Sequence, residues 1–167
     1  MIENRFVSLS PEEQNLYNPA YVGVILYHAI RECQSKNKTG LHCTLAYLVA
    51  PLALTTRFTM VLPSSVSTPI AGWTAENEGT LVGFSELVTG YLDIVNSAIS
   101  FLLQRGAINL DDDGFYRVDN DLVPKLPSMV KNNPAFKQGF QSGGFLGRWF
   151  ACASSVEIIY THFGVAP

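Results

Sequence analysis

Charged residues are scarce in this sequence. Only 15% of its 167 residues are charged, against roughly 25% in typical soluble domains, whereas 47% are hydrophobic. The 11 basic and 14 acidic residues give a formal net charge of −3, so no overall attraction draws the chain to nucleic acid, where affinity depends on Lys and Arg. Since a surface with few charges is partly apolar, we interpret the chain as a subunit that docks on another protein. A monomer with a large core is the alternative.

Cysteine is also scarce. The three cysteines, Cys33, Cys43 and Cys152, are an odd number and lie in apolar helical patterns, which is typical of reduced thiols in a cytosolic protein. They form no Cys-x-x-Cys pair, and the three histidines form no His-x-x-x-His pair, so no metal site is predicted.

Long hydrophobic runs are missing as well. The longest apolar stretch, from Leu45 to Leu62, is interrupted by Pro51 and Arg57 and falls short of the roughly 20 residues that span a bilayer. The first residues, 1–5, do not begin a secretory signal. We therefore expect a cytoplasmic protein with no membrane segment, folded as a single domain over residues 1–167.

Helix signals organise the first part of this domain, residues 18–62. Asn18 as N-cap and Pro19 at the first helical position predict a helix that ends near residues 33–35. A second helix is predicted over residues 41–50, where Pro51 stops or kinks it, and a further apolar turn follows to about residue 60.

Residues 67–119 combine helices with the clearest β pattern. Thr68-Pro69 begins a short helix, and apolar periodicity predicts two more helices, over 81–91 and 93–104. Alternating residues on both sides of an Asp-Asp-Asp-Gly turn then predict a β-hairpin over 107–118. The predicted fold class is mainly α with one small β-hairpin, and the helix-helix-hairpin order predicts a winged-helix-like unit.

Residues 133–165 are predicted to form the C-terminal helices. Asn133-Pro134 begins one helix, and apolar residues at helical spacing predict an almost uninterrupted helix from Gly143 to the end of the chain, closed by Gly164. Gly139 and Gly143-Gly144 are predicted to separate these helices and to let them cross closely or bend. The connection over residues 119–133 is rich in proline and is predicted to be extended or rich in turns.

A winged helix suggests DNA binding, but the charges here oppose it. The candidate recognition helix carries Asp93 and mostly uncharged polar residues, and the hairpin turn places Asp111, Asp112 and Asp113 where phosphates would lie. Docking on protein is therefore preferred, and a DNA-binding regulator or DNA-sensing subunit is the alternative. The same aspartates lack the ligand spacing of an EF-hand.

Four residues are predicted as partner-interface candidates: Arg57, Trp73, Arg148 and Trp149. Each arginine is an isolated charge in an apolar segment, so it is either solvated or an anchor for a carboxylate on this or a partner chain. Tryptophans are common interface anchors, although Trp149 fits a core position better. No activated nucleophile and no paired carboxylates on an apolar helix are present, so no catalytic residue, cofactor or enzymatic activity is predicted.

Several short motifs together resemble a known family. They are Asn18-Pro19-Ala20, Leu26-Tyr27-His28, Pro51-Leu52, Thr56-Arg57, Leu62-Pro63, Trp73, Gly147-Arg148-Trp149-Phe150 and the ending Ile159-Tyr160-Thr161-His162-Phe163-Gly164-Val165. This set, which covers most of residues 18–167, resembles the middle component of three-component ABC systems.

The resemblance implies a small accessory subunit of a bacterial anti-invader system of the Lamassu kind. Its partners would be an SMC-like ABC ATPase and an effector, often a nuclease. The ATPase would recognise foreign DNA, and this subunit would brace the ATPase and hold the effector inactive until release. Contact between this chain and DNA would be at most indirect.

Overall fold

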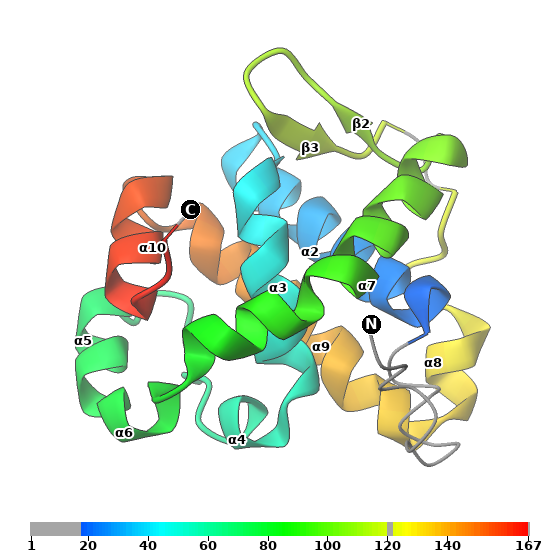
Figure 1. Cartoon of the computed structure of the whole chain (residues 1–167). Coiled ribbons are helices and arrows are strands. Elements are labelled where there is room, and N and C mark those ends of the chain that lie inside the picture. Colours follow the sequence, from blue (N-terminus) through cyan, green and yellow to red (C-terminus); the bar gives the residue numbers. More distant parts are fainter. Residues whose placement is uncertain (1–17, 120–121, 167) are drawn as a thin grey trace, which may run out of the picture.

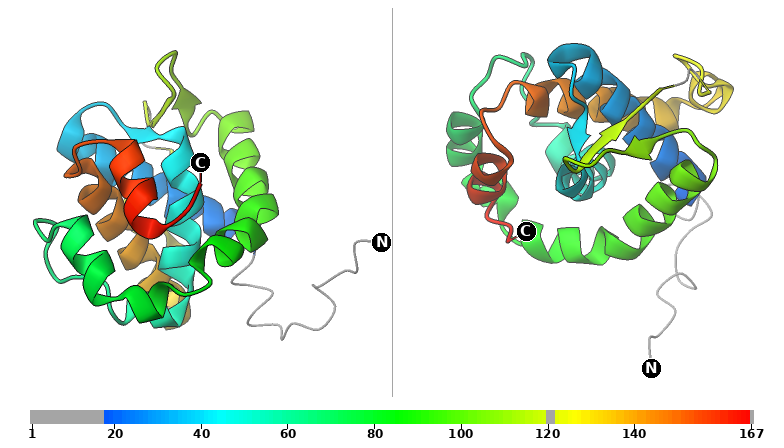
Figure 2. Two further views of the ribbon diagram at one scale, coloured as in Figure 1. Left: turned by 60° about the vertical axis from the view of Figure 1, so that its left-hand side comes forward. Right: turned by 90° about the horizontal axis from the view of Figure 1, so that it is seen from above.

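A central apolar helix, α3 (Ala46–Leu54), organises the computed structural model, which describes residues 18–119 and 122–166. In Figure 1, α3 lies between α7 (Phe84–Gln104) in front and the pair α2 (Pro19–Asn37) and α9 (Pro134–Ala151) behind, and the view from above in Figure 2 shows the same order. Seven of the residues of α3 are buried. A helix that is hydrophobic on all sides needs neighbours on all sides, and these three helices provide them.

The other elements surround this arrangement. Helices α5 and α10 pack together along its left side in Figure 1, and a small antiparallel sheet of strand order β1-β3-β2 lies at the top. These elements are β1 (Leu41–His42), the 3-10 helix η2 (Cys43–Leu45), α4 (Thr56–Thr59), α5 (Ile70–Glu76), α6 (Glu78–Leu81), β2 (Asn109–Leu110), β3 (Phe115–Arg117), α8 (Ser128–Asn132) and α10 (Val156–Phe163).

Helices α2 and α9 approach closely because glycines of α9 face α2. Gly139, Gly143 and Gly147 recur every four residues and therefore share one face. A Cβ added at Gly143 would lie 2.7 Å from a methyl carbon of Ile25, and one added at Gly147 would overlap the carbonyl oxygen of Ala29. The glycines do permit a close helix crossing, but it lies between α9 and α2 and not between the two C-terminal helices of the prediction. The prediction that these glycines separate two helices is wrong, since all of them lie inside α9.

The chain end contains a break that contradicts the predicted, almost uninterrupted terminal helix. Helix α9 ends at Ala151, and α10 begins after Ser155, whose hydroxyl oxygen accepts a hydrogen bond from the N–H of Ile158. Serine competes with the helix for backbone hydrogen bonds and favours an N-cap, so the Ser154-Ser155 pair restarts the helix. Gly164 ends α10 with φ +66°, as predicted.

The helix α7 is continuous over 21 residues, so the prediction of separate helices over 81–91 and 93–104 is wrong. It curves around α3 (Figure 2). The hydroxyls of Thr89 and Ser97 donate to carbonyls four residues earlier, a pattern that bends helices without ending them. Because one long helix precedes the hairpin, the winged-helix-like unit is not confirmed.

The predicted hairpin is confirmed, and it gains a third strand. Strands β2 and β3 pair around a turn in which Gly114 has φ +86°. Leu41 and His42 form β1 and pair with Tyr116 and Phe115 of β3. The predicted helix over 41–50 is therefore wrong at its start, because these two residues add an edge to the hairpin instead.

Three further boundaries differ from prediction. Helix α3 continues past Pro51 to Leu54, and α2 continues to Asn37, where Lys38 adopts a left-handed φ of +68°. The connection over 119–133 contains the short helix α8. The predicted lack of a secretory signal concerns residues 1–5, which lie outside the described residues.

By length and composition α7 is also apolar enough to cross a membrane, a property that the search for apolar runs did not indicate. Core helices of soluble proteins pass the same test. Here α7 packs against α2 and α3, with Val88, Val95 and Ala98 among its buried residues.

Candidate functional site

The two predicted tryptophans lie in the core. Trp73 and Trp149 are 4% and 1% exposed, and their rings meet edge to face with centroids 5.4 Å apart. Each indole N–H donates a 2.7 Å hydrogen bond to a backbone carbonyl, that of Val61 for Trp73 and that of Thr68 for Trp149. The pair therefore joins the loop before α5 to the end of α9, and neither ring lies at the surface where a partner would dock.

The two predicted arginines lie at the surface. Arg148 in α9 is paired within the chain, since its Nη1 lies 2.5 Å from Oε2 of Glu32 in α2. Both side chains remain partly exposed, at 40% and 27%, so water screens the pair. Arg57 in α4 is exposed, and its guanidinium lies 4.6 Å from the ring centre of Phe58. Of the alternatives for Arg148, a carboxylate on this chain is the one found.

The seam between α2 and α9 contains a histidine that the sequence analysis did not select. His28 stacks flat on Phe140, with ring centroids 4.0 Å apart. Burial lowers the pKa of His28 to about 4. Glu32 opposes this shift, and Arg31 and Arg148 add to it. His28, Arg31 and Glu32 are spaced three and four residues apart, and this spacing was the signal that they share one face of α2.

Arg31 holds the connection after the hairpin against α2. Its guanidinium donates to the carbonyls of Val123 and Lys125, each at 3.2 Å. Leu122 and Leu126 beside them are 57% and 52% exposed. This part of the surface therefore combines apolar side chains with a positive charge.

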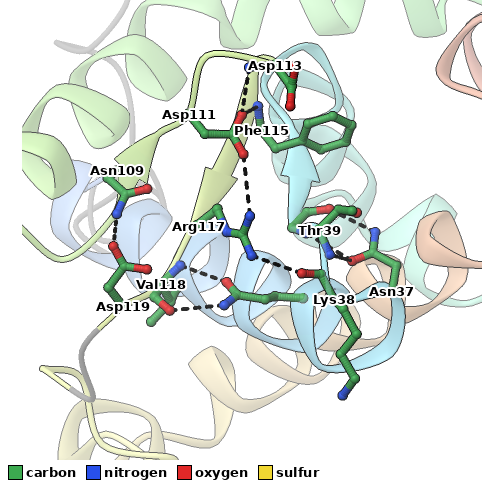
Figure 3. Close-up of polar contacts among 12 residues, drawn as sticks. Asn37, Lys38, Thr39, Asn109, Asp111, Asp113, Phe115, Arg117, Val118 and Asp119 are labelled. Atoms are coloured by element: carbon green, nitrogen blue, oxygen red, sulfur yellow. Dashed lines mark hydrogen bonds and ion pairs between the residues drawn. The ribbon is translucent and has the colours of Figure 1, made fainter.

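Polar contacts fix the hairpin to the end of α2 (Figure 3). The side chain of Gln34 accepts from the N–H of Val118 at 2.8 Å and donates to its carbonyl at 3.2 Å. Arg117 donates to the carbonyl of Lys38 at 3.0 Å and lies 3.6 Å from Asp111. These contacts are structural, because each of these polar groups binds another part of the same chain.

Charge is distributed unevenly among the helices. No Lys or Arg occurs between Arg57 and Arg105, nor after Arg148. We call α5, α6, α7 and α10 the acidic side; they carry no basic residue and five acidic ones, Glu76, Glu78, Glu86, Asp93 and Glu157. We call α2, α8 and α9 the basic side; they carry Arg31, Lys36, Lys131, Lys137 and Arg148, and one acidic residue, Glu32.

Two grooves open on the acidic side. The first has a volume of about 740 Å³ and lies between α5, α6, the start of α7 and the end of α10. The second, of about 490 Å³, lies between the loop before α5 and the break between α9 and α10. Ala71 and His162 line both grooves. The first also contains Glu78, Val82 and Glu86, and the second contains Thr68, Trp149, Cys152 and Ile158.

The described residues offer no evident metal centre. Within residues 18–119 and 122–166, no group of three or more His, Cys, Asp or Glu side chains is placed to hold a metal ion. His42 has a local structural role: its Nδ1 lies 2.9 Å from the hydroxyl of Thr44, and its side chain caps η2 by accepting a hydrogen bond from the N–H of Thr44.

Comparison with known proteins gives one match. A model of the family described as ABC-three component (ABC-3C) system Middle Component 3 matches residues 7–167. No match was found among the curated proteins or among the solved structures that were compared. Since the family model covers nearly the whole sequence, the chain belongs to the Middle Component 3 family of ABC-three component systems.

Proposed function

We propose that this chain is a non-catalytic accessory subunit that couples an SMC-like ABC ATPase to an effector, expected to be a nuclease. The complex would act in the cytoplasm against phages and plasmids, as in systems of the Lamassu type. Membership of a three-component system supports the existence of partner subunits. The observation that carries the proposal is the segregation of charge, which leaves four helices without a single Lys or Arg.

The same observation disfavours direct DNA binding. A recognition helix in the major groove would be α7, whose charged residues are Glu86 and Asp93. Asp112 and Asp113 at the hairpin tip are exposed. Carboxylates at these positions would repel phosphates. Helix α7 also carries no Lys or Arg that could neutralise DNA phosphates and displace the counterions bound to them. Such a surface suits contact with protein, where apolar area counts for more than charge.

Close packing of α2 on α9 supports a coupling role. A Cβ at Gly147 has no room beside the Ala29 carbonyl, so these helices cannot slide past each other without losing their packing. A displacement of α9 by one partner is therefore passed to α2 as a rigid movement. We propose that this pair transmits the state of the ATPase to the effector.

The test is co-expression with the ATPase and effector subunits encoded beside this chain. Affinity purification through a tag on this chain, followed by size-exclusion chromatography, should recover at least one of the two subunits in the same peak. A chain that elutes alone as a monomer in the presence of both would contradict the proposal. In a mobility-shift titration at low salt, the isolated chain should not bind DNA in the micromolar range; binding there would favour the DNA-sensing alternative.

A further inference from the structure

The two grooves on the acidic side are neighbours, and we call them together the depression. Ala71 on α5 and His162 on α10 line both of them, so the grooves adjoin where these helices pack together. Phe84 and Phe163 line the first groove, and Trp149 lines the second. The rest of the lining is dominated by small side chains. These three rings are almost fully buried, so they form the floor of the grooves, and an occupant would contact mainly the exposed side chains around them.

Each of the two grooves has an exposed apolar side chain in its lining. Val82, in the first groove, is 70% exposed, and Ile158, in the second, is 43% exposed. Ala71 between them is exposed as well. Apolar side chains gathered around a groove gain free energy when a complementary apolar segment covers them.

The charges of the residues that line the grooves favour an occupant of positive charge. The lining contains Glu78 and Glu86 and no Lys or Arg. No cation lies elsewhere on α5, α6, α7 or α10 to offset these carboxylates. An acidic occupant would be repelled, whereas a basic one would gain complementary charge at the rim of the groove.

We infer that this depression binds a segment of another component of the same system, one that combines apolar side chains with Lys or Arg. The inference rests on the proposed function and names the chemistry of the partner. The apolar side chains of the segment cover Val82, Ala71 and Ile158, and its basic side chains face Glu78 and Glu86.

The first 17 residues of this chain fit less well as the occupant. They contain Glu3, Glu12 and Glu13 against Arg5, which gives a net charge of −2. A second copy would have to use its basic side, and light scattering coupled to size-exclusion chromatography measures that outcome directly. A stable dimer that Glu78→Lys dissociates would overturn the assignment to another component.

Photo-crosslinking identifies the occupant. The photoreactive amino acid p-benzoylphenylalanine replaces Ala71 in the depression or, as a control, the exposed Ser100 on α7, which lies on the acidic side but outside both grooves. After co-expression with the other two subunits, position 71 should crosslink to a partner segment of net positive charge, and position 100 should not. Crosslinking from position 100 alone, or from position 71 to an acidic segment, would overturn the inference.

Charge reversal gives an independent measurement. Glu78→Lys places a cation in the groove, and Glu76→Lys makes the same change two residues away, outside the lining. Titration of the purified partner subunit should show about a tenfold weaker affinity for Glu78→Lys and less than about a threefold change for Glu76→Lys. Circular dichroism checks that both variants fold.

The outcomes separate the two proposals. If the wild-type chain binds neither partner subunit, the proposed function fails and the groove assignment fails with it. If the wild-type chain binds a partner and Glu78→Lys binds it equally well, the groove assignment fails while the proposed function stands.

Discussion

The acidic side and the basic side of this protein are held together in different ways. On the basic side α2 and α9 meet backbone to backbone through Gly143 and Gly147, which leaves no space between them. On the acidic side, the short helices α5 and α10 are joined through large rings such as Trp73 and Phe163, whose centroids lie 5.9 Å apart. Large side chains between short helices leave hollows at the surface, and the grooves of about 740 and 490 Å³ open there, whereas the groove beside Arg31 and Gln34 on the basic side is smaller, at about 310 Å³.

The largest effect should come from filling the close contact on the basic side. Gly147→Ala places a methyl group against the backbone carbonyl of Ala29, which no rotamer change relieves. We expect a loss of about 3 kcal/mol in the free energy of unfolding. Urea denaturation followed by circular dichroism measures it.

The matched control lies on the acidic side. Gly90 is an exposed residue inside α7, and a Cβ added there meets nothing within 4 Å. Since alanine is a better helix former, Gly90→Ala should gain about 0.5 to 1 kcal/mol. Equal destabilisation by both variants would show that the two sides do not differ in packing.

A smaller effect should appear as the pH falls, and it comes from the basic side. Burial lowers the folded-state pKa of His28 to about 4, against about 6.5 in an unfolded chain. Its contribution to stability is therefore fully present above pH 6.5 and is lost as the pH falls toward 4, because the unfolded state takes up the proton first. Allowing for solvent screening of a partly exposed ring, we expect a loss of about 1 to 2 kcal/mol.

The comparison that isolates this loss uses His28→Asn. The free energy of unfolding is measured for the wild type and the variant at pH 7 and at pH 4.5. The difference between the two proteins should be smaller at pH 4.5 than at pH 7. A difference that does not change with pH would mean that the ring of His28 titrates freely in the folded protein.

The ion pair of the basic side should contribute less. Arg148 and Glu32 are 2.5 Å apart but partly exposed, so a double-mutant cycle with Arg148→Gln and Glu32→Gln should give a coupling below about 1 kcal/mol. Exchanging the two charges, in Glu32→Arg with Arg148→Glu, should preserve binding of the partner subunit. If this variant folds but no longer binds the partner subunit, Arg148 contacts the partner, as the sequence analysis predicted.

The smallest effect is expected in a test that involves no substitution, which compares the rates at which two cysteine thiols are labelled. Cys152 is exposed in the second groove, whereas burial raises the pKa of the Cys33 thiol to about 12. Iodoacetamide should therefore label Cys152 and leave Cys33 unmodified in the folded protein. Binding of the partner subunit should slow labelling of Cys152 several-fold, and an unchanged rate would place the partner elsewhere.

Local signals in the sequence were sufficient for elements whose ends are set by one or two residues. Asn18 and Asn133 cap α2 and α9 through hydrogen bonds to the N–H groups of Ala20 and Ala135, as their Asn-Pro pairs predict. Gly114 and Gly164 adopt the positive φ expected at a hairpin turn and a helix end. These residues act on their neighbours in the chain, which is why a single sequence reveals them.

Features that depend on distant contacts were not predictable in this way. Leu41 and His42 directly precede the apolar segment that forms a helix, but they pair instead with β3, which is more than 70 residues away in the sequence. Trp73 and Trp149 stand out in the sequence, and only the fold shows that they pack against each other in the core. The grooves likewise arise from α5, α7 and α10 together, so no single segment indicates them.

The contact between α2 and α9 also has a consequence for synthesis in the cell. The last residue of α2 is Asn37 and the first of α9 is Pro134, so the 96 residues 38–133 separate the two helices that pack most closely. At roughly 5 to 20 residues per second, a ribosome needs about 5 to 20 s to make the second partner after the first. During that time the face of α2 that carries Ile25 and Ala29 lacks its partner α9, and its exposed apolar surface favours aggregation of the nascent chain.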